Sequence, residues 1–287
     1  MKEFNLVSPR HEVEIHLPDG RVIAGPRGSM VGDFLSVIDH DSQLVGAVVN
    51  GNLRELTFPV EMDSRVIPVT MSTPDGTRIY RRSLTFLLEM VFADMYPLAT
   101  LFIDHSVATG GCYCEVKGRE PLSISELGVL KVLMQKFVKD DLPFARKEVP
   151  LKEAMDYFLA RGEEDKVQLL KYRKKAYLTL YSLNERMDYH HGYMVPSTGY
   201  LRWFDLVPAG DGFTLLYPSR RNPNELSPTF EYPKLLATFL QYGGWLEKLG
   251  ISNVGSLNHA IESGHGDEIV MVSEAFHEQR LSQIAGQ

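Results

Sequence analysis

The chain has 287 residues, of which 44% are hydrophobic and 23% charged, and its formal net charge at pH 7 is −7. A chain of this length can form about two or three globular cores, and the lack of any run of about 18 apolar residues argues against a helical membrane span. The acidic balance argues against non-specific binding of duplex nucleic acid, although it permits one local basic patch, such as residues 171–175.

The two cysteines, Cys112 and Cys114, are separated by one residue, which places them on the same face of a strand. This spacing suits neither a structural disulfide nor a zinc knuckle. We interpret both as buried small side chains. Because the first residues, MKEFNLVSPRHEVEIH, lack a secretory leader pattern, we expect a reduced, cytoplasmic protein with no membrane partner.

The first part of the chain has the order of elements of a β-grasp module. Residues 11–24 predict two strands joined by a turn at Pro18-Asp19-Gly20. A short helix follows, with Ser29 as its predicted cap. The next apolar run is broken by Asn50-Gly51, a strong hairpin signal, and residues 66–71 form the last predicted strand.

The middle of the chain mixes helices and strands. Residues 79–96 have helical spacing and end before Pro97, while strands are predicted on both sides of Gly110-Gly111. Ser123 and Glu126 have the spacing of a capping box, which predicts a helix to about Val138. Two further helices follow, the second from about 163.

In the last third of the chain, strands are predicted first and helices afterwards. Residues 176–217 are strand-like, with Gly210–Phe213 as a hairpin turn. Helical spacing returns at 232–249, 254–263 and 267–284. The fold class predicted for the whole chain is α+β.

Several stretches, taken in order, follow a known arrangement of domains. LPDGRVI (17–23) and VVNGNLREL (48–56) resemble the TGS module, a β-grasp domain at the front of threonyl-tRNA synthetases. RRSLTFLLEMVFADMYP (81–97), FLARGEEDKVQLL (158–170) and MDYHHGYMVP (187–196) resemble the domain that edits mischarged tRNA. The resemblance implies a TGS-like β-grasp domain at 8–72, an editing-like α+β domain at 73–215, and a mostly helical segment at 216–287.

Three later stretches, 194–226, 244–264 and 269–285, carry a second resemblance. They resemble a region of bacterial uridine-kinase-like proteins, in which a TGS module and an editing-like domain precede a phosphoribulokinase/uridine kinase domain. This implies a regulatory or ligand- or RNA-sensing module, with a kinase domain in cis beyond Gln287 if the gene continues. A phosphate loop G-x-x-x-x-G-K-[ST] is missing from the chain, so we expect no kinase activity and no cofactor here.

The resemblance implies an editing site with two helix histidines, a loop cysteine and a loop histidine. The matching positions here are Arg82, Phe86, His190 and Met194. Arginine stays protonated, and phenylalanine and methionine neither move protons nor hold zinc usefully. We therefore expect a degenerate site without ester hydrolysis or bound metal. The alternative is a Ser-tRNA deacylase of altered chemistry that uses His190 or His191.

The cleft of such a site would still collect polar side chains. The candidates are Arg82, His105, His190, His191 and Tyr193. Arg82 would hold a carboxylate or phosphate of an RNA or small-molecule ligand, or else pair with a nearby acid. A histidine in a turn, such as His105, is more often solvated.

Two further features concern partners. Arg220, Arg221 and Asn222 could contact phosphate or dock onto the kinase domain, or form a polar turn. Residues 267–284 carry a broad apolar helical stripe. Because such a stripe tends to become covered, we expect a homodimer, or a helix folded back on 232–263.

Overall fold

The computed structural model describes residues 8, 10–38, 44–107, 110–227 and 233–286. The chain divides into two compact units: unit 1 is Met1–Arg146 with Leu180–Glu231, and unit 2 is Lys147–Thr179 with Tyr232–Gln287. The predicted bounds, three domains in chain order, do not coincide with this division and stay a prediction. Within the described part of the chain, no helix combines the length and the apolar character that crossing a membrane requires.

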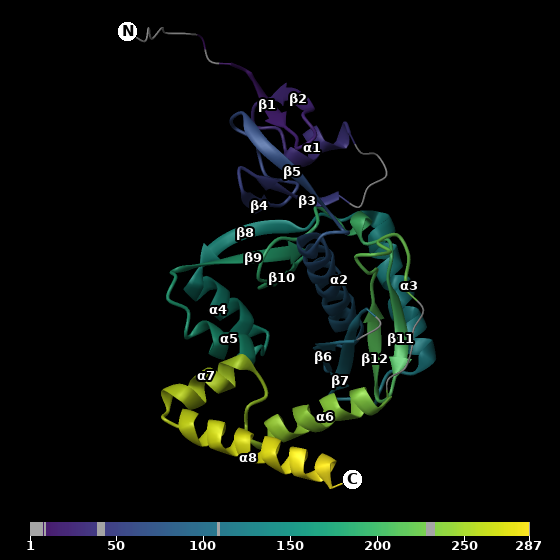
Figure 1. Cartoon of the computed structure of the whole chain (residues 1–287), viewed down its shortest axis with the longest axis vertical. Coiled ribbons are helices and arrows are strands. Elements are labelled where there is room, and N and C mark those ends of the chain that lie inside the picture. Colours follow the sequence, from purple (N-terminus) through teal and green to yellow (C-terminus); the bar gives the residue numbers. More distant parts are fainter. Residues whose placement is uncertain (1–7, 9, 39–43, 108–109, 228–232, 287) are drawn as a thin grey trace. The chain divides into compact units, whose positions relative to one another are not determined.

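Unit 1 begins with a five-stranded sheet of order β2-β1-β5-β3-β4 that carries a short helix (Figure 1). The pair β1–β5 is parallel, and the other neighbours are antiparallel. This arrangement confirms the predicted β-grasp order. The elements are β1 (Glu12–His16), β2 (Val22–Pro26), α1 (Val31–Ser36), β3 (Leu44–Val49), β4 (Asn52–Arg54) and β5 (Ser64–Thr70).

The hairpin between β3 and β4 is turned by Asn50 and Gly51, whose φ angles are 49° and 81°. Two successive positive φ angles match the right-handed twist of the strands, so the predicted hairpin is confirmed. The predicted cap of α1 is wrong by one residue. Met30 precedes the helix, and its backbone N–H donates to the Asp33 carboxylate at 3.1 Å, which leaves the cap role to the acid rather than to Ser29.

Strand β3 is buried on both faces, which joins the β-grasp to the rest of unit 1. Its residues Leu44, Ala47 and Val49 belong to the β-grasp core. Val45 belongs instead to the larger core built around the next helix, as does Val69 of β5. A strand buried on both faces is a continuous apolar run, and β3 reads LVGAVV.

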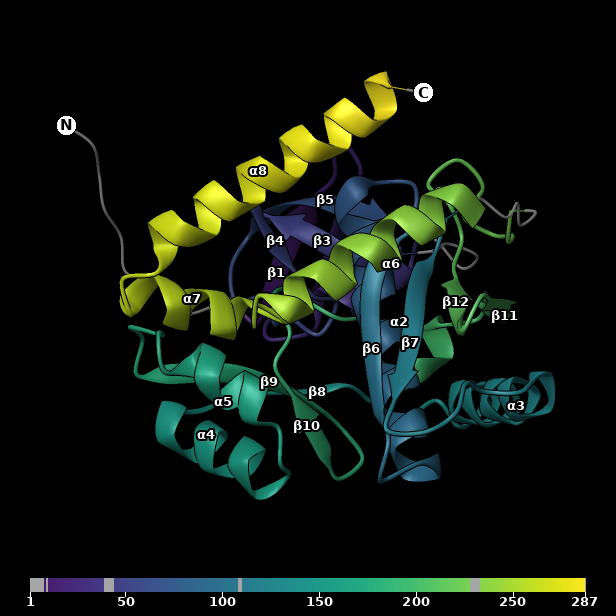
Figure 2. The same ribbon diagram turned by 90° about the horizontal axis from the view of Figure 1, so that it is seen from below.

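The long helix α2 (Pro74–Met95) is the centre of the remainder of unit 1. It begins five residues before the predicted start, because Thr73 accepts a hydrogen bond from Gly76 N–H at 3.1 Å and Pro74 fits the first turn. Figures 1 and 2 show α2 beside an antiparallel sheet of order β11-β12-β7-β6, with which it shares the core. Both cysteines are free and buried on β7, as predicted.

The other elements of this region complete the mixed α+β fold. Ser123 and Glu126 form the predicted capping box of α3. A second antiparallel pair, β9 with β10, belongs to a three-stranded sheet with β8, a strand that the sequence analysis missed. The bounds are β6 (Thr100–Ser106), β7 (Cys112–Lys117), α3 (Ile124–Asp140), β8 (Ala145–Pro150), β9 (Tyr177–Leu183), β10 (Arg186–Asp188), the 3₁₀ turn η1 (Thr198–Tyr200), β11 (Asp205–Ala209) and β12 (Gly212–Leu216).

Unit 2 is mainly helical. Its helices are α4 (Leu151–Ala160), α5 (Glu164–Leu170), α6 (Pro233–Lys248), α7 (Val254–Glu262) and α8 (Gly266–Ala285). Helix α7 lies against α5, where a Cβ on Gly255 would come within 3.0 Å of the Leu169 nitrogen. The Trp245 ring of α6 contacts Phe276 of α8, with centroids 4.7 Å apart, although no residue of α8 is buried.

Candidate functional site

One face of α2 meets the loop that follows β10. Arg82, Phe86 and Glu89 are spaced i, i+4 and i+7, which puts them on one stripe of the helix. The Arg82 guanidinium donates to the Tyr193 carbonyl. The Phe86 ring packs on His190 with centroids 5.0 Å apart, and a Glu89 carboxylate oxygen lies 4.0 Å from His190 Nε2. The helix stripe and the loop 188–195 thus form one site.

The loop is fastened tightly to the helix. The fully buried Ser83 accepts a hydrogen bond from Val195 N–H at 2.9 Å and donates to the Ile79 carbonyl at 2.9 Å. Gly192 has a φ of 102°, and a Cβ there would lie 2.9–3.1 Å from the Arg82 guanidinium. Only glycine permits both this conformation and this approach, so the loop rests directly on Arg82.

The Arg82 side chain connects helix α2 to the loop 188–195. Burial is the main cause that lowers the pKa of its guanidinium, and the nearby cations Arg81 and Arg78 lower it further. An arginine nevertheless stays charged at pH 7. Its hydrogen bond goes to a backbone carbonyl. The ligand contact and the acid partner weighed from the sequence stay predictions.

The four positions carried over from the resemblance lie in an apolar setting. Phe86 is 2% exposed and Met194 is 1% exposed, and both belong to the main core of unit 1. Phe86 also lies 6.0 Å from the ring of Phe144. Among the four, only His190 is of a residue type that serves as a general acid or base.

His190 has two acidic neighbours that the sequence analysis did not single out. Glu89, Asp188 and His190 each offer a ligand atom, and these atoms lie within 4.8 Å of one another. Tetrahedral zinc with bonds of about 2.1 Å separates its ligand atoms by about 3.4 Å, so the 4.0 Å between Glu89 and His190 is wide for zinc. Two features of the sequence could have indicated this cluster. Glu89 lies seven residues after Arg82, on the same helix stripe, and Asp188 lies two residues before His190.

His191 and Tyr193, the other loop candidates, have different surroundings. His191 is exposed and its ring nitrogens lie 3.0 and 3.3 Å from the Tyr189 hydroxyl. The half-buried Tyr193 accepts a hydrogen bond from the Arg54 guanidinium of β4 at 3.1 Å. The end of the β-grasp hairpin therefore contacts the loop.

A second contact of this kind lies next to the first. The Tyr181 hydroxyl donates to a Glu55 carboxylate oxygen at 2.8 Å. Burial raises the pKa of Tyr181, and the Glu55 charge raises it further, so the phenol stays protonated. Arg54 and Glu55 were missed from the sequence because nothing local to either segment predicts the contact.

His105 lies on β6, on the sheet side of unit 1. Its Nδ1 is 2.9 Å from a carboxylate oxygen of Asp104, and its ring stacks on Tyr113 at 5.4 Å. The ring contact joins β6 to β7. Its assignment to the cleft stays a prediction.

Arg220 lies beside the start of α2. It lines a depression of about 240 Å³ together with Pro74, Thr77, Arg78 and Arg81. The other two candidates of this segment, Arg221 and Asn222, are exposed, and Asn222 N–H donates to Ser219 in a local turn. Of the three, only Arg220 lines this depression.

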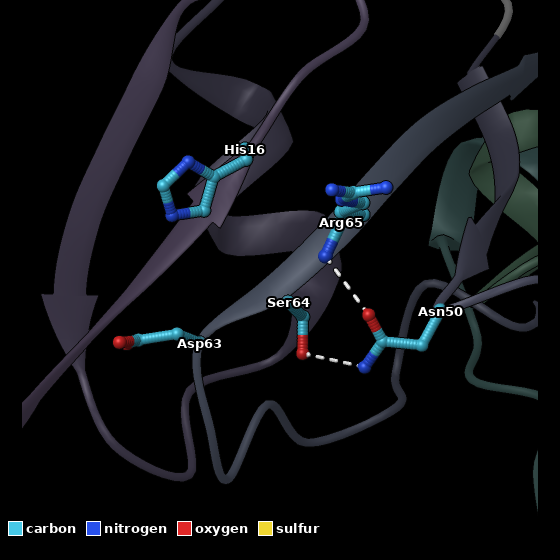
Figure 3. A pocket seen from close by; sticks show the side chains of 5 residues that line it. All are labelled: His16, Asn50, Asp63, Ser64 and Arg65. Carbon is cyan, nitrogen blue, oxygen red and sulfur yellow. Dashed lines mark hydrogen bonds between the residues drawn. The ribbon is translucent and has the colours of Figure 1, made fainter.

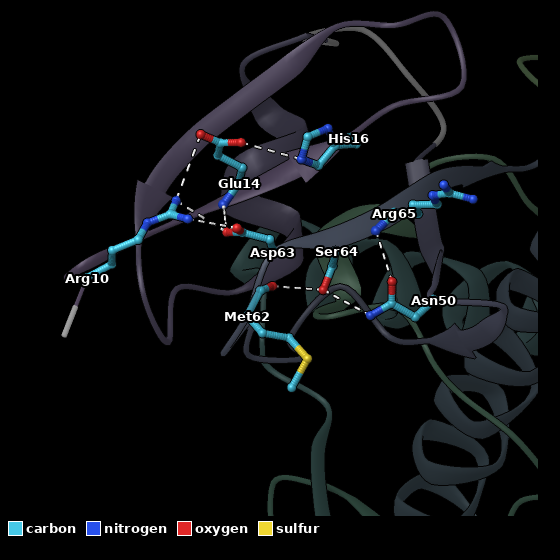
Figure 4. Close-up of polar contacts among 8 residues, drawn as sticks. All are labelled: Arg10, Glu14, His16, Asn50, Met62, Asp63, Ser64 and Arg65. Carbon is cyan, nitrogen blue, oxygen red and sulfur yellow. Dashed lines mark hydrogen bonds and ion pairs between the residues drawn. The ribbon is translucent and has the colours of Figure 1, made fainter. Parts of the chain in front are cut away.

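Another polar depression, of about 430 Å³, lies on the β-grasp (Figure 3). It is lined by His16, Asn50, Asp63, Ser64 and Arg65. Figure 4 shows that Asn50 bonds to Ser64 and Arg65. His16 and Asp63 are instead joined to Glu14. Asn50 accepts from Arg65 N–H at 2.9 Å and donates to the Ser64 hydroxyl at 3.1 Å.

The carboxylate in this depression is also engaged by its neighbours. Asp63 accepts from Glu14 N–H at 2.9 Å and pairs with Arg10 at 2.8 Å. The hydrogen bond from Glu14 N–H is the first cause that lowers the pKa of Asp63. These contacts hold the ends of β1 and β5 together, and we assign the cluster to the stability of the β-grasp.

The fold and the helix–loop site define an α+β protein in which a TGS-like β-grasp precedes an editing-like domain. No family model matches the chain. Among known proteins it is similar to threonine–tRNA ligases. It is 25% identical over 207 residues to that of Lawsonia intracellularis, 28% over 198 residues to threonine–tRNA ligase 2 of Bacillus subtilis, and 29% over 210 residues to that of Magnetococcus marinus.

These matches cover 68–70% of this chain and 31–32% of the ligases. The chain thus spans about a third of the length of the curated relatives it matches.

Proposed function

We propose that the chain is a tRNA-editing-related module that binds tRNA but does not hydrolyse aminoacyl-tRNA through the four positions of the editing site. The similarity to threonine–tRNA ligases supports tRNA as the partner. The matched segment is about a third of those proteins, so we do not extend their ligase activity to this chain. Two of the three segments that resemble the editing domain, 81–97 and 187–196, meet in the helix–loop site.

The single observation that carries the absence of hydrolysis is the packing of Phe86 on His190. Ester hydrolysis needs a group that takes a proton from water and a position for that water. The buried Phe86 supplies an apolar surface at one catalytic position, and Met194 supplies another. The Arg82 guanidinium donates a hydrogen bond to the Tyr193 carbonyl, and a protonated arginine cannot act as the base.

A specific observation favours a second candidate, deacylation by altered chemistry. His190 Nε2 lies 4.0 Å from a Glu89 carboxylate oxygen. A carboxylate beside an imidazole orients it and raises its basicity, as in other general-base pairs. In this candidate His190 removes the proton of the attacking water and Glu89 positions the ring.

One experiment separates the two candidates. Threonine tRNA charged with serine is incubated with the chain, and both binding and release of serine are measured. We expect binding in the micromolar range or tighter and release at the rate of the tRNA alone. Release well above that rate, lost in both His190→Ala and Glu89→Gln, would establish the second candidate. No binding to charged or uncharged tRNA would contradict the proposal itself.

The finer sequence-based prediction, that the module regulates a nucleoside kinase, has no support from these ligase relatives. It stays a prediction. Sequencing the gene beyond Gln287 tests it, because a phosphate loop in the same reading frame is required.

A further inference from the structure

The depression at the start of α2 is lined by a concentration of positive charge. Its lining residues are Pro74, Thr77, Arg78, Arg81 and Arg220. Three of the five are arginines, none is an acid, and all three arginines are exposed. This is notable in a chain with a net charge of −7, because the excess of acids elsewhere makes a chance basic cluster less expected.

The arginines converge from two distant segments. Arg78 and Arg81 are spaced i, i+3, so they project from the same side of α2, where like charges repel. Arg220 joins them from the segment after β12. Such a grouping is unfavourable for the empty protein and becomes favourable when an anion binds among the guanidinium groups.

The contacts of these side chains leave most of this charge uncompensated. Arg78 pairs with Asp75 at 3.0 Å, and both partners are exposed, so the pair is weak. Arg81 donates to the Ser106 hydroxyl at 3.4 Å, near the limit for a hydrogen bond. Among the described residues, Asp75 is the one carboxylate seen to pair with these three guanidinium groups, which leaves a local excess of positive charge.

We propose that Arg78, Arg81 and Arg220 form a site for the phosphate backbone of RNA. This inference rests on the proposed function, and it names the part of the surface that the tRNA contacts. Guanidinium groups bind phosphodiester oxygens by paired N–H donors. The positive end of the α2 dipole lies at the same place and has the same sign. Backbone contacts of this kind position an RNA without reading its sequence.

The test compares neighbouring arginines of which only one lines the depression. Arg220→Gln and Arg221→Gln remove the same charge from adjacent exposed positions, and only Arg220 lines the site. Binding of a labelled, uncharged tRNA transcript is measured between 50 and 200 mM salt. We expect Arg220→Gln to weaken binding by about 3- to 10-fold at the lowest salt and to reduce the salt slope by about 0.9. Arg221→Gln should change affinity by less than about 2-fold.

Further variants and a second probe keep the outcomes distinct. Arg78→Gln combined with Arg220→Gln should reduce the slope by about twice as much, with an unchanged melting temperature because both side chains are exposed. Equal effects of Arg220→Gln and Arg221→Gln would overturn the inference and leave the proposed function standing.

Inorganic phosphate is the second probe. If phosphate raised the melting temperature of the wild type but not of Arg220→Gln, while both bound tRNA equally, the site would belong to free phosphate and the RNA assignment would be wrong. Failure of the wild type to bind tRNA at all would overturn the proposed function, and this result differs from both of the others.

Discussion

The imidazole of His190 lies against the phenyl ring of Phe86, with ring centroids 5.0 Å apart and planes inclined at 55°. In the resemblance drawn from the sequence, these residues match two positions of the editing site. The contact joins the loop to the α2 face that carries Phe86, a residue of the main apolar core of unit 1.

Phe86→Ala tests how much this contact stabilises unit 1. Because Phe86 is 2% exposed, its loss leaves a cavity under His190, and we expect unfolding to become easier by about 3–5 kcal/mol. Phe102→Ala is the control, since that ring is 41% exposed and should cost about 1 kcal/mol or less. Urea midpoints followed by far-UV circular dichroism measure both. Equal shifts would mean that Phe86 does not support the site as described.

Gly192→Ala tests the approach of the loop to Arg82. The φ of 102° and the 2.9–3.1 Å from a Cβ to the guanidinium predict both strain and a clash. Gly20→Ala has a similar φ of 86° and open space around it, so it should show the strain alone, about 1–2 kcal/mol. We expect Gly192→Ala to cost at least about 1 kcal/mol more than this control.

A double-mutant cycle with Arg82→Ala isolates the clash. Removing the guanidinium should remove its clash with the added methyl group. The double variant should therefore be more stable, by about 0.5–3 kcal/mol, than the sum of the two single destabilisations predicts. Additive effects would mean that the loop does not rest on Arg82.

The capping box of α3 predicts a loss of stability in acid. The hydrogen bond from Ser123 N–H is the first cause that lowers the pKa of Glu126 from its ordinary 4.5 to about 2, followed by the ion pair with Arg119. Since the folded value is the lower one, the stabilisation is complete above pH 4.5 and disappears as the pH falls towards 2.

Urea midpoints measured from pH 7 to pH 2 test this prediction. Glu126→Gln should lower the midpoint at neutral pH and flatten its dependence on pH between 4.5 and 2. Glu120→Gln, outside the capping box, is the matched control. An unchanged pH profile in Glu126→Gln would place the acid sensitivity elsewhere.

The helix–loop site should not hold stoichiometric zinc. Glu89, Asp188 and His190 supply one imidazole and two carboxylates, and the 4.0 Å between Glu89 and His190 exceeds the spacing that tetrahedral zinc requires. Elemental analysis of protein purified without chelator measures the content. One zinc per chain, lost in both Glu89→Gln and His190→Ala, would show that the loop closes around a metal and would favour the deacylase candidate.

Much of the fold follows from local sequence signals. Asn50-Gly51 predicts the hairpin because few residue pairs accept two positive φ angles. Ser123 and Glu126 predict the start of α3 because the capping box is a local exchange of hydrogen bonds. The start of α2 was placed too late because the prediction followed the apolar spacing from residue 79, whereas Pro74 and Gly76 fit a first turn capped by Thr73.

The parts of the site that the sequence did not predict depend on distant contacts. Arg54 reaches the Tyr193 hydroxyl across 139 residues, and Glu55 reaches Tyr181 across 126. Arg220 was a candidate because of its own segment, but the sequence did not predict that the fold would bring Arg78 and Arg81 next to it. Such contacts are set by tertiary packing, for which one sequence without a fold holds no local pattern.

The apolar side chains of helix α8 predict self-association of the chain. No residue of α8 is buried, and its apolar side chains include Leu281 and Ile284, which are 48% and 58% exposed. The contact of Phe276 with Trp245 covers one side chain of the stripe and leaves these two in water. Since exposed apolar surface favours association, we expect the free chain to dimerise as its concentration rises.

Sedimentation at several concentrations measures this association. Leu281→Glu with Ile284→Glu should keep the chain monomeric, because charges would have to be buried in the contact. Ser282→Glu with Gln283→Glu adds the same charge at polar, exposed positions of α8 and should leave the dimer largely intact. A wild-type chain that stays monomeric at every concentration would contradict the prediction. A dimer that both double variants weaken equally would show that net charge, rather than the apolar stripe, controls association.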